Sequence, residues 1–254
     1  GEIVRPSDGA HPHKILFVLC VGSRDRRHYR HCSRFCCMYS IKHAYQALDH
    51  GVTDVTVLYM DIRAYGKGFD GFWDRTKAAG AKFVRGRPAK IEAKKREGAK
   101  AREGEDALMT HYPSLMTPSP SLEVVYEDTE TGTRHTEDFD MVVLANAVTP
   151  PAGLAELAER LGLELGDDCF LKVEELRGGL IATTRPGIYA AGCDTGPKDI
   201  PDSVAEGSGA AALALGHLTE RFWPEPPAVE PILDVETPHV GVFVCHCGSN
   251  IAGV

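Results

Sequence analysis

Four cysteines gather near the start of the chain, in the segment CVGSRDRRHYRHCSRFCC: Cys20, Cys32, Cys36 and Cys37. Cys20 follows the apolar run 15–19, and the other three stand at the start of a helix-like segment. In a doubly wound α/β fold, such a strand-to-helix corner usually holds a dinucleotide on a glycine-rich turn. Thiols stand there instead, which suggests a metal-based electron carrier.

The spacing of the four thiols narrows their chemistry. Eleven residues separate Cys20 from Cys32, three separate Cys32 from Cys36, and Cys36 and Cys37 are adjacent. This pattern favours an iron–sulfur cluster on all four residues, because structural zinc sites usually show two short chelating pairs. Two alternatives stay open: a redox dithiol, although adjacent cysteines pair with strain, and cysteines that merely fill the core.

Arginines surround these thiols in a chain that is otherwise acidic. A thiolate-bound cluster carries negative charge, which guanidinium groups and a helix N-terminus would stabilise. The same side chains also fit a basic surface loop that docks an acidic partner, and the two interpretations are compatible. The arginines are Arg24, Arg26, Arg27, Arg30 and Arg34.

The composition excludes several classes of protein. With 254 residues and 43% hydrophobic residues, the chain has the make-up of an ordinary globular protein. A net charge of −8 argues against binding to nucleic acid or to an anionic membrane surface. There is no apolar run long enough for a membrane span and no visible signal peptide. Eight clustered cysteines favour a reducing compartment, so we expect a cytoplasmic location.

The first half of the chain predicts an α/β fold, a Rossmann-like unit with a parallel sheet and an added β-meander. Its last strand is expected to return into the parallel sheet. The charged excursion KKREGAKAREGEDALMTHYPSLMTPSPS interrupts the meander. The expected strands are Lys14–Leu19, Asp54–Met60, Lys82–Arg85, one that begins at Ile91, Leu122–Glu127, Arg134–Glu137 and Asp140–Ala145, and the helices are Ser33–His50, Phe69–Ala79 and Leu154–Leu161.

A glycine pattern, G-x-G-x-x-G, occurs at Gly66, Gly68 and Gly71. In a dinucleotide site the first glycine follows the strand at once. Here residues 61–65 intervene and the strand is the second one. We therefore interpret the glycines as a turn that starts the second helix.

A second corner, AAGCDTGPKDIPDSVAEGSGAAALAL, joins an expected strand at Gly187–Ala191 to an expected helix at Asp202–Leu218. In flavoproteins such a helix points its positive N-terminus at the flavin ring. A tight packing corner without a ligand is the alternative. Lys198 is the expected charge that stabilises reduced flavin. The expected flavin-lining residues are Gly192, Cys193, Asp194, Lys198, Asp199, Ile200, Ser203 and Val204.

These residues taken together resemble the A-type subunits of heterodisulfide reductases, a family of iron–sulfur flavoproteins. The stretches that carry the resemblance are CVGSRD, CSRFCCMYSIKHA, YMDIRAYGKG, VRGRPAKIE, YEDTETG and IYAAGCDTGPKDIPDSVA. The resemblance implies an oxidoreductase of methanogenesis with a thioredoxin-reductase-like core and FAD. It places a four-iron four-sulfur (4Fe-4S) cluster on Cys20, Cys32, Cys36 and Cys37, with electron relay, and bifurcation, at the flavin. It also implies an oligomeric complex with other reductase subunits, ferredoxin, and a hydrogenase or formate dehydrogenase subunit.

The resemblance divides the chain into three parts. Residues 1–149 are the nicotinamide-domain-like unit with the cysteines, and 150–221 are the C-terminal part of an FAD-binding domain. Residues 222–254 are a Pro-rich linker and the start of a further module, VFVCHCGSNIAGV, in which Cys245 and Cys247 either serve that module or bind nothing.

Some residues depart from the family pattern. Asn146 stands where a glycine-bearing stretch is expected, and Glu206 stands where an amide is expected. The N-terminal half of the FAD domain is missing, so complete FAD binding needs another segment. Two rival functions follow from the residues themselves: an NAD(P)H-dependent disulfide reductase with dithiol cysteines, and a zinc-stabilised module without catalytic activity.

Overall fold

The computed structural model describes residues 2–94, 121–174 and 181–218. Residues Gly1–Gly216 form one compact unit. The charged excursion and the cysteines at 245 and 247 lie outside the described residues. The expected division at residues 149 and 150 stays a prediction.

A parallel sheet organises the first half of the chain. Its strands are β1 (Lys14–Val21), β2 (Asp54–Tyr59), β3 (Lys82–Arg85) and β7 (Met141–Asn146), in the order β3-β2-β1-β7. All neighbouring pairs run parallel. The apolar runs of β1 and β2 are buried on both faces, as a covered parallel sheet requires. The sequence predicted this α/β arrangement, including the return of β7 into the parallel sheet, and the structure places β7 beside β1.

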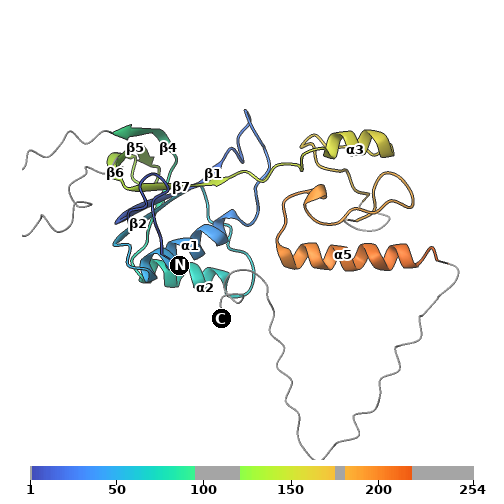
Figure 1. The fold of residues 1–254 in the computed structure, drawn as a ribbon, viewed down its shortest axis with the longest axis horizontal. Helices are drawn as coiled ribbons and strands as arrows, with labels where there is room; N and C mark the ends of the chain where they lie inside the picture. The colour runs from blue at the N-terminus through green and yellow to red at the C-terminus, as the bar shows by residue number, and fades with distance from the viewer. Residues whose placement is uncertain (1, 95–120, 175–180, 219–254) are drawn as a thin grey trace, which may run out of the picture. The chain divides into compact units, whose positions relative to one another are not determined.

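Two different layers cover the sheet (Figure 1). On one face lie helices α1 (Cys36–Asp49) and α2 (Phe69–Ala78). On the other face lies an antiparallel sheet of β4 (Pro88–Lys94), β5 (Ser121–Asp128) and β6 (Thr133–Phe139).

Strand β1 feeds a separate core on each face. Ile15, Phe17 and Leu19 pack with α1, whereas Leu16 and Val18 pack with residues of β5 and β6. Because side chains alternate along a strand, one short apolar run supplies both cores.

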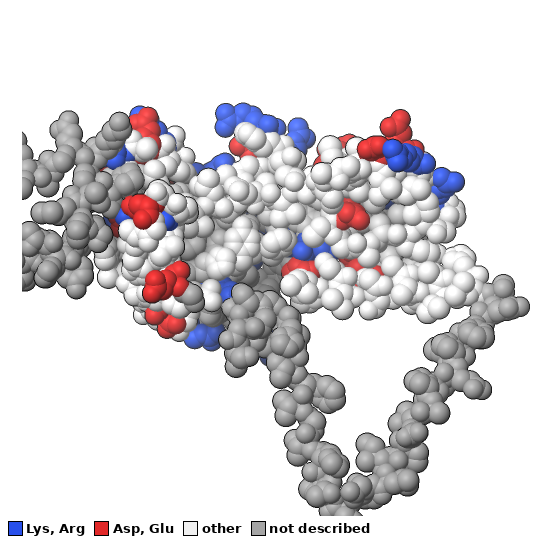
Figure 2. Space-filling model, in the orientation of Figure 1, with Lys and Arg blue, Asp and Glu red and all other residues white. Residues whose placement is uncertain are grey.

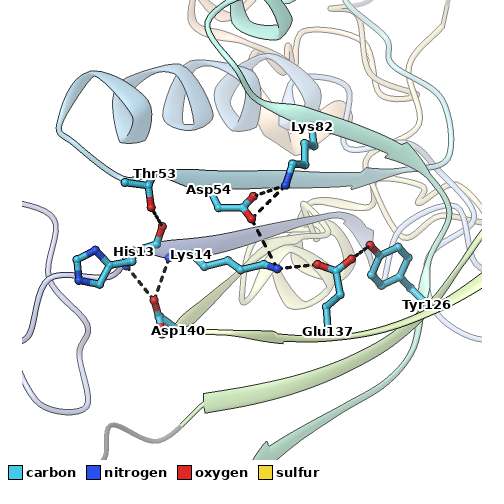
Figure 3. Close-up of polar contacts among 8 residues, drawn as sticks. All are labelled: His13, Lys14, Thr53, Asp54, Lys82, Tyr126, Glu137 and Asp140. Carbon is cyan, nitrogen blue, oxygen red and sulfur yellow. Dashed lines mark hydrogen bonds and ion pairs between the residues drawn. The ribbon is translucent and has the colours of Figure 1, made fainter.

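A polar network joins the strands at the amino end of the sheet (Figure 3). The Lys14 ammonium lies 2.6 Å from Glu137 and 3.6 Å from Asp54, and Tyr126 donates a hydrogen bond to Glu137. Asp140 accepts bonds from the backbone N–H groups of residues 13 and 14, each at 2.9 Å. Burial alone would raise the pKa of Glu137, but the bonds from Lys14 and Tyr126 outweigh it and lower that pKa. The network fixes strand register far along the sheet from the cysteines.

The remainder of the first unit contains helix α3 (Leu154–Leu161), the short 3₁₀ helix η3 (Cys193–Thr195) and helix α5 (Ile200–Leu215). A small core of Leu154, Ala158, Leu171 and Ala190 holds α3 in place. The expected strand at Gly187–Ala191 is wrong, since this stretch forms only an isolated bridge between Tyr189 and Ala182. Within the described residues it has no strand beside it to complete a ladder.

Helix boundaries differ from the expected ones for identifiable reasons. Helix α1 begins at Cys36 and not at Ser33, because Arg34 adopts a left-handed conformation with φ of 65°. Helix α5 begins at Ile200, because Asp199 caps it by accepting a hydrogen bond from the Asp202 N–H at 3.0 Å. Gly68, with φ of 88°, is the N-cap of α2. The glycine pattern therefore starts a helix, as predicted.

Candidate functional site

The cysteine corner lies where the strand order reverses. Strand β1 connects to β2 on one side and pairs with β7 on the other, so the carboxyl ends of β1 and β7 form a topological switch point. Ligands of open α/β sheets bind outside the strands at this point. Pairing of β1 with β7 slips between Val18 and Val21, and Cys20 in this bulge has φ of 58°. Such a conformation is costly for a residue with a side chain and suggests a functional constraint.

Helix α1 places two more thiols at the same edge. Cys36 and Cys37 are its first residues, both are buried, and the first turn contains no acidic side chain. The unpaired N–H groups of a helix N-terminus stabilise thiolates. Cys32 lies on the preceding loop, partly exposed, and its sulfur accepts a hydrogen bond from the Arg34 N–H at 3.3 Å.

The thiols interact with one another. The hydrogen bond with Cys36 is the main reason why the pKa of Cys20 falls to about 6, and a second bond with Cys36 lowers the pKa of Cys37 to about 7. The hydrogen bonds with Cys20 and Cys37, together with burial, raise the pKa of Cys36. Cys20, Cys36 and Cys37 therefore lie close together.

Polar groups complete the surroundings of the thiols. The positive charge of Arg24 acts on both Cys20 and Cys32, and its guanidinium pairs with Asp61 beyond β2. The Cys37 thiol donates to the Asp61 carbonyl at 3.8 Å. Beside Cys20, the hydroxyl of Ser23 is buried and makes no hydrogen bond of normal distance and angle within the described part of the chain.

This donor set fits an iron–sulfur cluster. Four thiols, a nearby cation, a helix N-terminus and a buried hydroxyl match the needs of a negatively charged group with acceptor sulfurs. Across residues 2–94, 121–174 and 181–218, no three His, Cys, Asp or Glu side chains are grouped for a single metal ion. A cluster of four irons makes no such demand, because each thiolate binds a different iron.

The second corner surrounds a buried ion pair. The Lys198 ammonium lies 2.8 Å from Glu206, and their side chains are only 6% and 11% exposed. The same Glu206 oxygen accepts a hydrogen bond from the Gly192 N–H at 2.8 Å, and the Lys198 ammonium also donates to Thr195. Glu206 thus neutralises the Lys198 charge, which the sequence analysis expected to stabilise reduced flavin. It also connects the turn at Gly192 to α5.

The other expected flavin-lining residues occupy the same corner. Cys193 and Asp194 form η3 after Gly192, which has φ of 88°. The Cys193 thiol donates to the Lys198 carbonyl at 3.7 Å, and the Ser203 hydroxyl donates to the Asp199 carbonyl at 2.8 Å.

Helix α5 exposes much of its apolar surface. It has no fully buried residue, and Ile200 and Val204 are 80% and 63% exposed. Helix α5 does make one close contact, at Gly209. A Cβ at this position would approach the Ile181 side chain to 2.4 Å. The small residue at position 209 thus allows α5 to approach Ile181 closely.

One open cavity of about 860 Å³ is lined by residues near both corners. Arg34, Phe35 and Met38, which flank Cys36 and Cys37 in the sequence, form one part of its wall. Lys198, Asp199 and Ile200 of the second corner form another part. The remaining lining residues come mainly from α2 and the turn before it. An ion pair between Arg34 and Asp202 joins the start of α1 to the start of α5.

Sequence reasoning missed three features of this region. Asp61 was not identified, although its place directly after β2 puts it on the same carboxyl edge as the thiols. Tyr65, which bonds Arg34, and Phe72 line the cavity without any local signal. Lys198 and Glu206 also form an ion pair that was not predicted. Lys198 lies just before α5 and Glu206 lies about two helical turns later, and this spacing was the available clue.

Comparison with curated proteins identifies the relationship. The A subunit of the H2:CoB-CoM heterodisulfide,ferredoxin reductase of Methanothermobacter thermautotrophicus is 42% identical over 250 residues, which cover 96% of this chain. The iron-sulfur A subunit of the CoB–CoM heterodisulfide reductase of Methanocaldococcus jannaschii is 40% identical over 215 residues, or 84% of this chain.

The chain is homologous to a segment of the heterodisulfide reductase A subunit. It spans about a third of the length of these relatives, 34% and 29% respectively. The family resemblance seen in the sequence is thereby confirmed for this segment. No protein-family model matches the chain.

Solved structures similar to this chain include thioredoxin reductases. That of Lactococcus lactis has a TM-score of 0.49 and 19% identity, covering 80% of this chain and 52% of the other. The thioredoxin reductase of T. acidophilum has a TM-score of 0.46 and 14% identity, and the match again covers 80% of this chain and 52% of the other. None of the helices in the described ranges combines the length and apolarity that a bilayer span requires.

Proposed function

We propose that this chain is part of an electron-transferring flavoprotein subunit of the heterodisulfide reductase type. In this proposal Cys20, Cys32, Cys36 and Cys37 bind a four-iron four-sulfur cluster. The corner from Gly192 to Val204 lines the flavin of FAD. The names of the relatives, which include an iron-sulfur subunit, support the cluster.

The shared cavity carries the proposal. Its wall combines residues that adjoin the cysteine ligands with Lys198, Asp199 and Ile200 of the expected flavin corner. Its volume of about 860 Å³ is within the range of sites that accept a cofactor-sized ring system. A flavin exchanges electrons singly or in pairs and an iron–sulfur cluster exchanges them singly, so neighbouring sites would form a relay.

The residues of the chain have separate tasks in this relay. Arg24 and the N-terminus of α1 stabilise negative charge at the thiolates. Phe35 and Met38 contribute apolar surface to the wall of the cavity. Lys198 presents a cation that Glu206 balances, so the charge at the flavin edge depends on both residues.

The wider assembly is included in the proposal. The exposed apolar side of α5 supports the expectation that further segments complete the FAD site. Other reductase subunits, ferredoxin, and a hydrogenase or formate dehydrogenase subunit are the proposed partners, with bifurcation of electron pairs at the flavin in the cytoplasm. The names of the relatives include ferredoxin, H2 and formate.

Anaerobic purification tests the cluster directly. We expect about four irons and four sulfides per chain and, after reduction, a low-temperature spin-resonance signal. Cys36→Ser should abolish most of that signal. Cys169→Ser is the matched control, because Cys169 is an exposed free cysteine outside the cluster corner.

Three results would refute the assignment. They are an iron-free protein, an unchanged signal in Cys36→Ser, and tight NAD(P)H binding by iron-free protein. The last would favour the nicotinamide-dependent disulfide reductase, and stoichiometric zinc without flavin would favour the zinc-stabilised module.

A further inference from the structure

The loop of residues 24–30, RDRRHYR, is a rigid and strongly basic feature beside the thiols; we call it the arginine loop. It connects the segment of Cys20 to Cys32. Its two ends are joined by hydrogen bonds from the Arg24 N–H to the His31 carbonyl at 3.0 Å and from the Tyr29 N–H to the Gly22 carbonyl at 3.1 Å.

The base of the arginine loop is anchored to the rest of the unit. The His31 ring bonds the Val148 carbonyl at 2.8 Å and packs edge-on against Phe170, with ring centroids 5.2 Å apart. A loop held in this way presents its side chains in a fixed arrangement, which reduces the entropy lost when a partner binds.

The one acidic residue of the loop is used internally. The Asp25 side chain is 13% exposed, accepts a hydrogen bond from the Arg27 N–H at 2.9 Å and lies 3.9 Å from Arg87. Its negative charge therefore stabilises the turn and presents little charge to solvent.

Three arginines of the loop are exposed. Arg26 and Arg30 form no ion pair within the described part of the chain, and the Arg27 side chain, 86% exposed, lies 3.7 Å from Asp25. Arg24, Asp25, Arg26 and Arg30 line a hollow of about 430 Å³. Figure 2 shows Lys and Arg atoms gathered over the loop between β1 and α1, with little acidic surface beside them.

The thiols beneath this surface are unequally accessible. Cys20, Cys36 and Cys37 are buried, whereas Cys32, at the end of the loop, is partly exposed. Among the four proposed ligands, Cys32 therefore offers the shortest route from the cluster to a molecule bound on the loop.

We propose that the arginine loop is the docking surface for a small acidic iron–sulfur protein that exchanges one electron with the cluster near Cys32. This inference rests on the proposed function for the cluster. Spread-out guanidinium groups around an open hollow suit the carboxylates of a protein surface. Complementary charge speeds such transient encounters, and electron-transfer complexes are typically small.

The electron balance of the step is simple. One electron leaves the reduced iron–sulfur centre of the partner, which is oxidised, and enters the cluster held by this chain, which is reduced. No covalent bond forms or breaks, and no proton moves.

The test uses a reduced acidic ferredoxin and the anaerobically purified holoprotein. Binding is measured by calorimetry at about 50 mM and about 200 mM salt, and cluster reduction is followed by stopped-flow absorbance. We expect Arg26→Glu/Arg30→Glu to weaken binding and slow the second-order reduction by at least about tenfold, and to reduce the dependence on salt.

A matched double variant controls for net charge. Lys90→Glu/Arg134→Glu changes the charge equally at exposed positions on β4 and β6 and should retain native binding. Equal losses in both double variants, or no binding by the native protein, would overturn the docking surface.

Binding and reduction together separate the two proposals. If the purified protein contains no iron and only Arg26→Glu/Arg30→Glu loses ferredoxin binding, the result would support the loop and refute the relay. A native cluster signal with binding unaffected by Arg26→Glu/Arg30→Glu would refute the loop and leave the relay intact.

Discussion

The cysteine corner and the Gly192 corner both lead into a helix, but they differ in how completely the chain builds them. The first lies at the switch point of a sheet covered on both faces, and α1 buries six of its residues. The second precedes α5, which has no fully buried residue. A site for a compact inorganic group needs only one strand end and one helix, whereas a long dinucleotide needs surfaces from several segments.

The strain in the two corners also differs. Three of the four non-glycine residues with positive φ in the described ranges, Cys20, Arg24 and Arg34, lie in the cysteine corner. In the second corner, glycines at 192 and 196 take up the positive φ angles. The structure thus retains costly conformations where thiols and cations must be aimed, and avoids them where backbone alone forms a turn.

The largest effect should come from the ion pair of the second corner. Lys198→Met leaves the buried Glu206 carboxylate without its cation and should lower the free energy of unfolding by about 3–5 kcal/mol. Denaturant unfolding followed by circular dichroism measures this. Lys198→Met/Glu206→Gln should recover most of the loss, because the amide still accepts the Gly192 hydrogen bond. An additive loss in the double variant would contradict the pairing.

The next effect compares burial on the two helices. Ile41, on α1, is fully buried, so Ile41→Ala should cost about 2–5 kcal/mol. Val204, on α5, is largely exposed, so Val204→Ala should cost less than about 0.5 kcal/mol. Equilibrium unfolding of both variants tests the contrast. A large loss from Val204→Ala in this chain would show that the apolar side of α5 is already covered.

Two glycines of α5 provide a finer comparison. Gly207 has open space at the Cβ position, so Gly207→Ala should stabilise the helix by about 0.5–1 kcal/mol. Gly209→Ala should gain less or destabilise, since the new methyl group meets Ile181. The melting temperatures of Gly207→Ala and Gly209→Ala test this difference. Equal stabilisation by both substitutions would contradict the close contact between Gly209 and Ile181.

The smallest effect concerns the network at the far end of the sheet. The pKa of Glu137 is lowered in the folded chain, so its ionised form stabilises the fold above the unfolded pKa, and this contribution disappears as the pH falls through the folded pKa. Glu137→Gln should therefore destabilise the chain modestly near pH 7. Relative to the native protein, the deficit should shrink by about pH 3, and a constant deficit would exclude ionic stabilisation.

Local sequence patterns were sufficient for most of the sheet. The apolar runs before Cys20 and after Asp54 predicted β1 and β2, and the thiol spacing predicted which residues share a corner. The parallel direction of these strands followed from the β-α-β order of the elements.

Long-range contacts were beyond those patterns. The bridge of Tyr189 to Ala182 failed to become a strand because strand formation depends on a neighbour, which an apolar stretch cannot reveal. The pairing of Arg34 with Asp202 and of Arg24 with Asp61 depends on where distant turns meet. The left-handed conformation of Arg34, because of which α1 begins only at Cys36, could not be predicted either. Glycine and asparagine commonly indicate this conformation, whereas arginine does not.

The bulge at Cys20 has a consequence for how firmly its side chain is held. Strand pairing with β7 is regular up to Val18 and resumes at Val21, so the intervening kink is clamped on both sides by the polypeptide itself. The backbone on either side therefore fixes the direction of the Cys20 side chain. Under the proposed function, the position of this ligand would be set by strand pairing and would depend little on the group it binds.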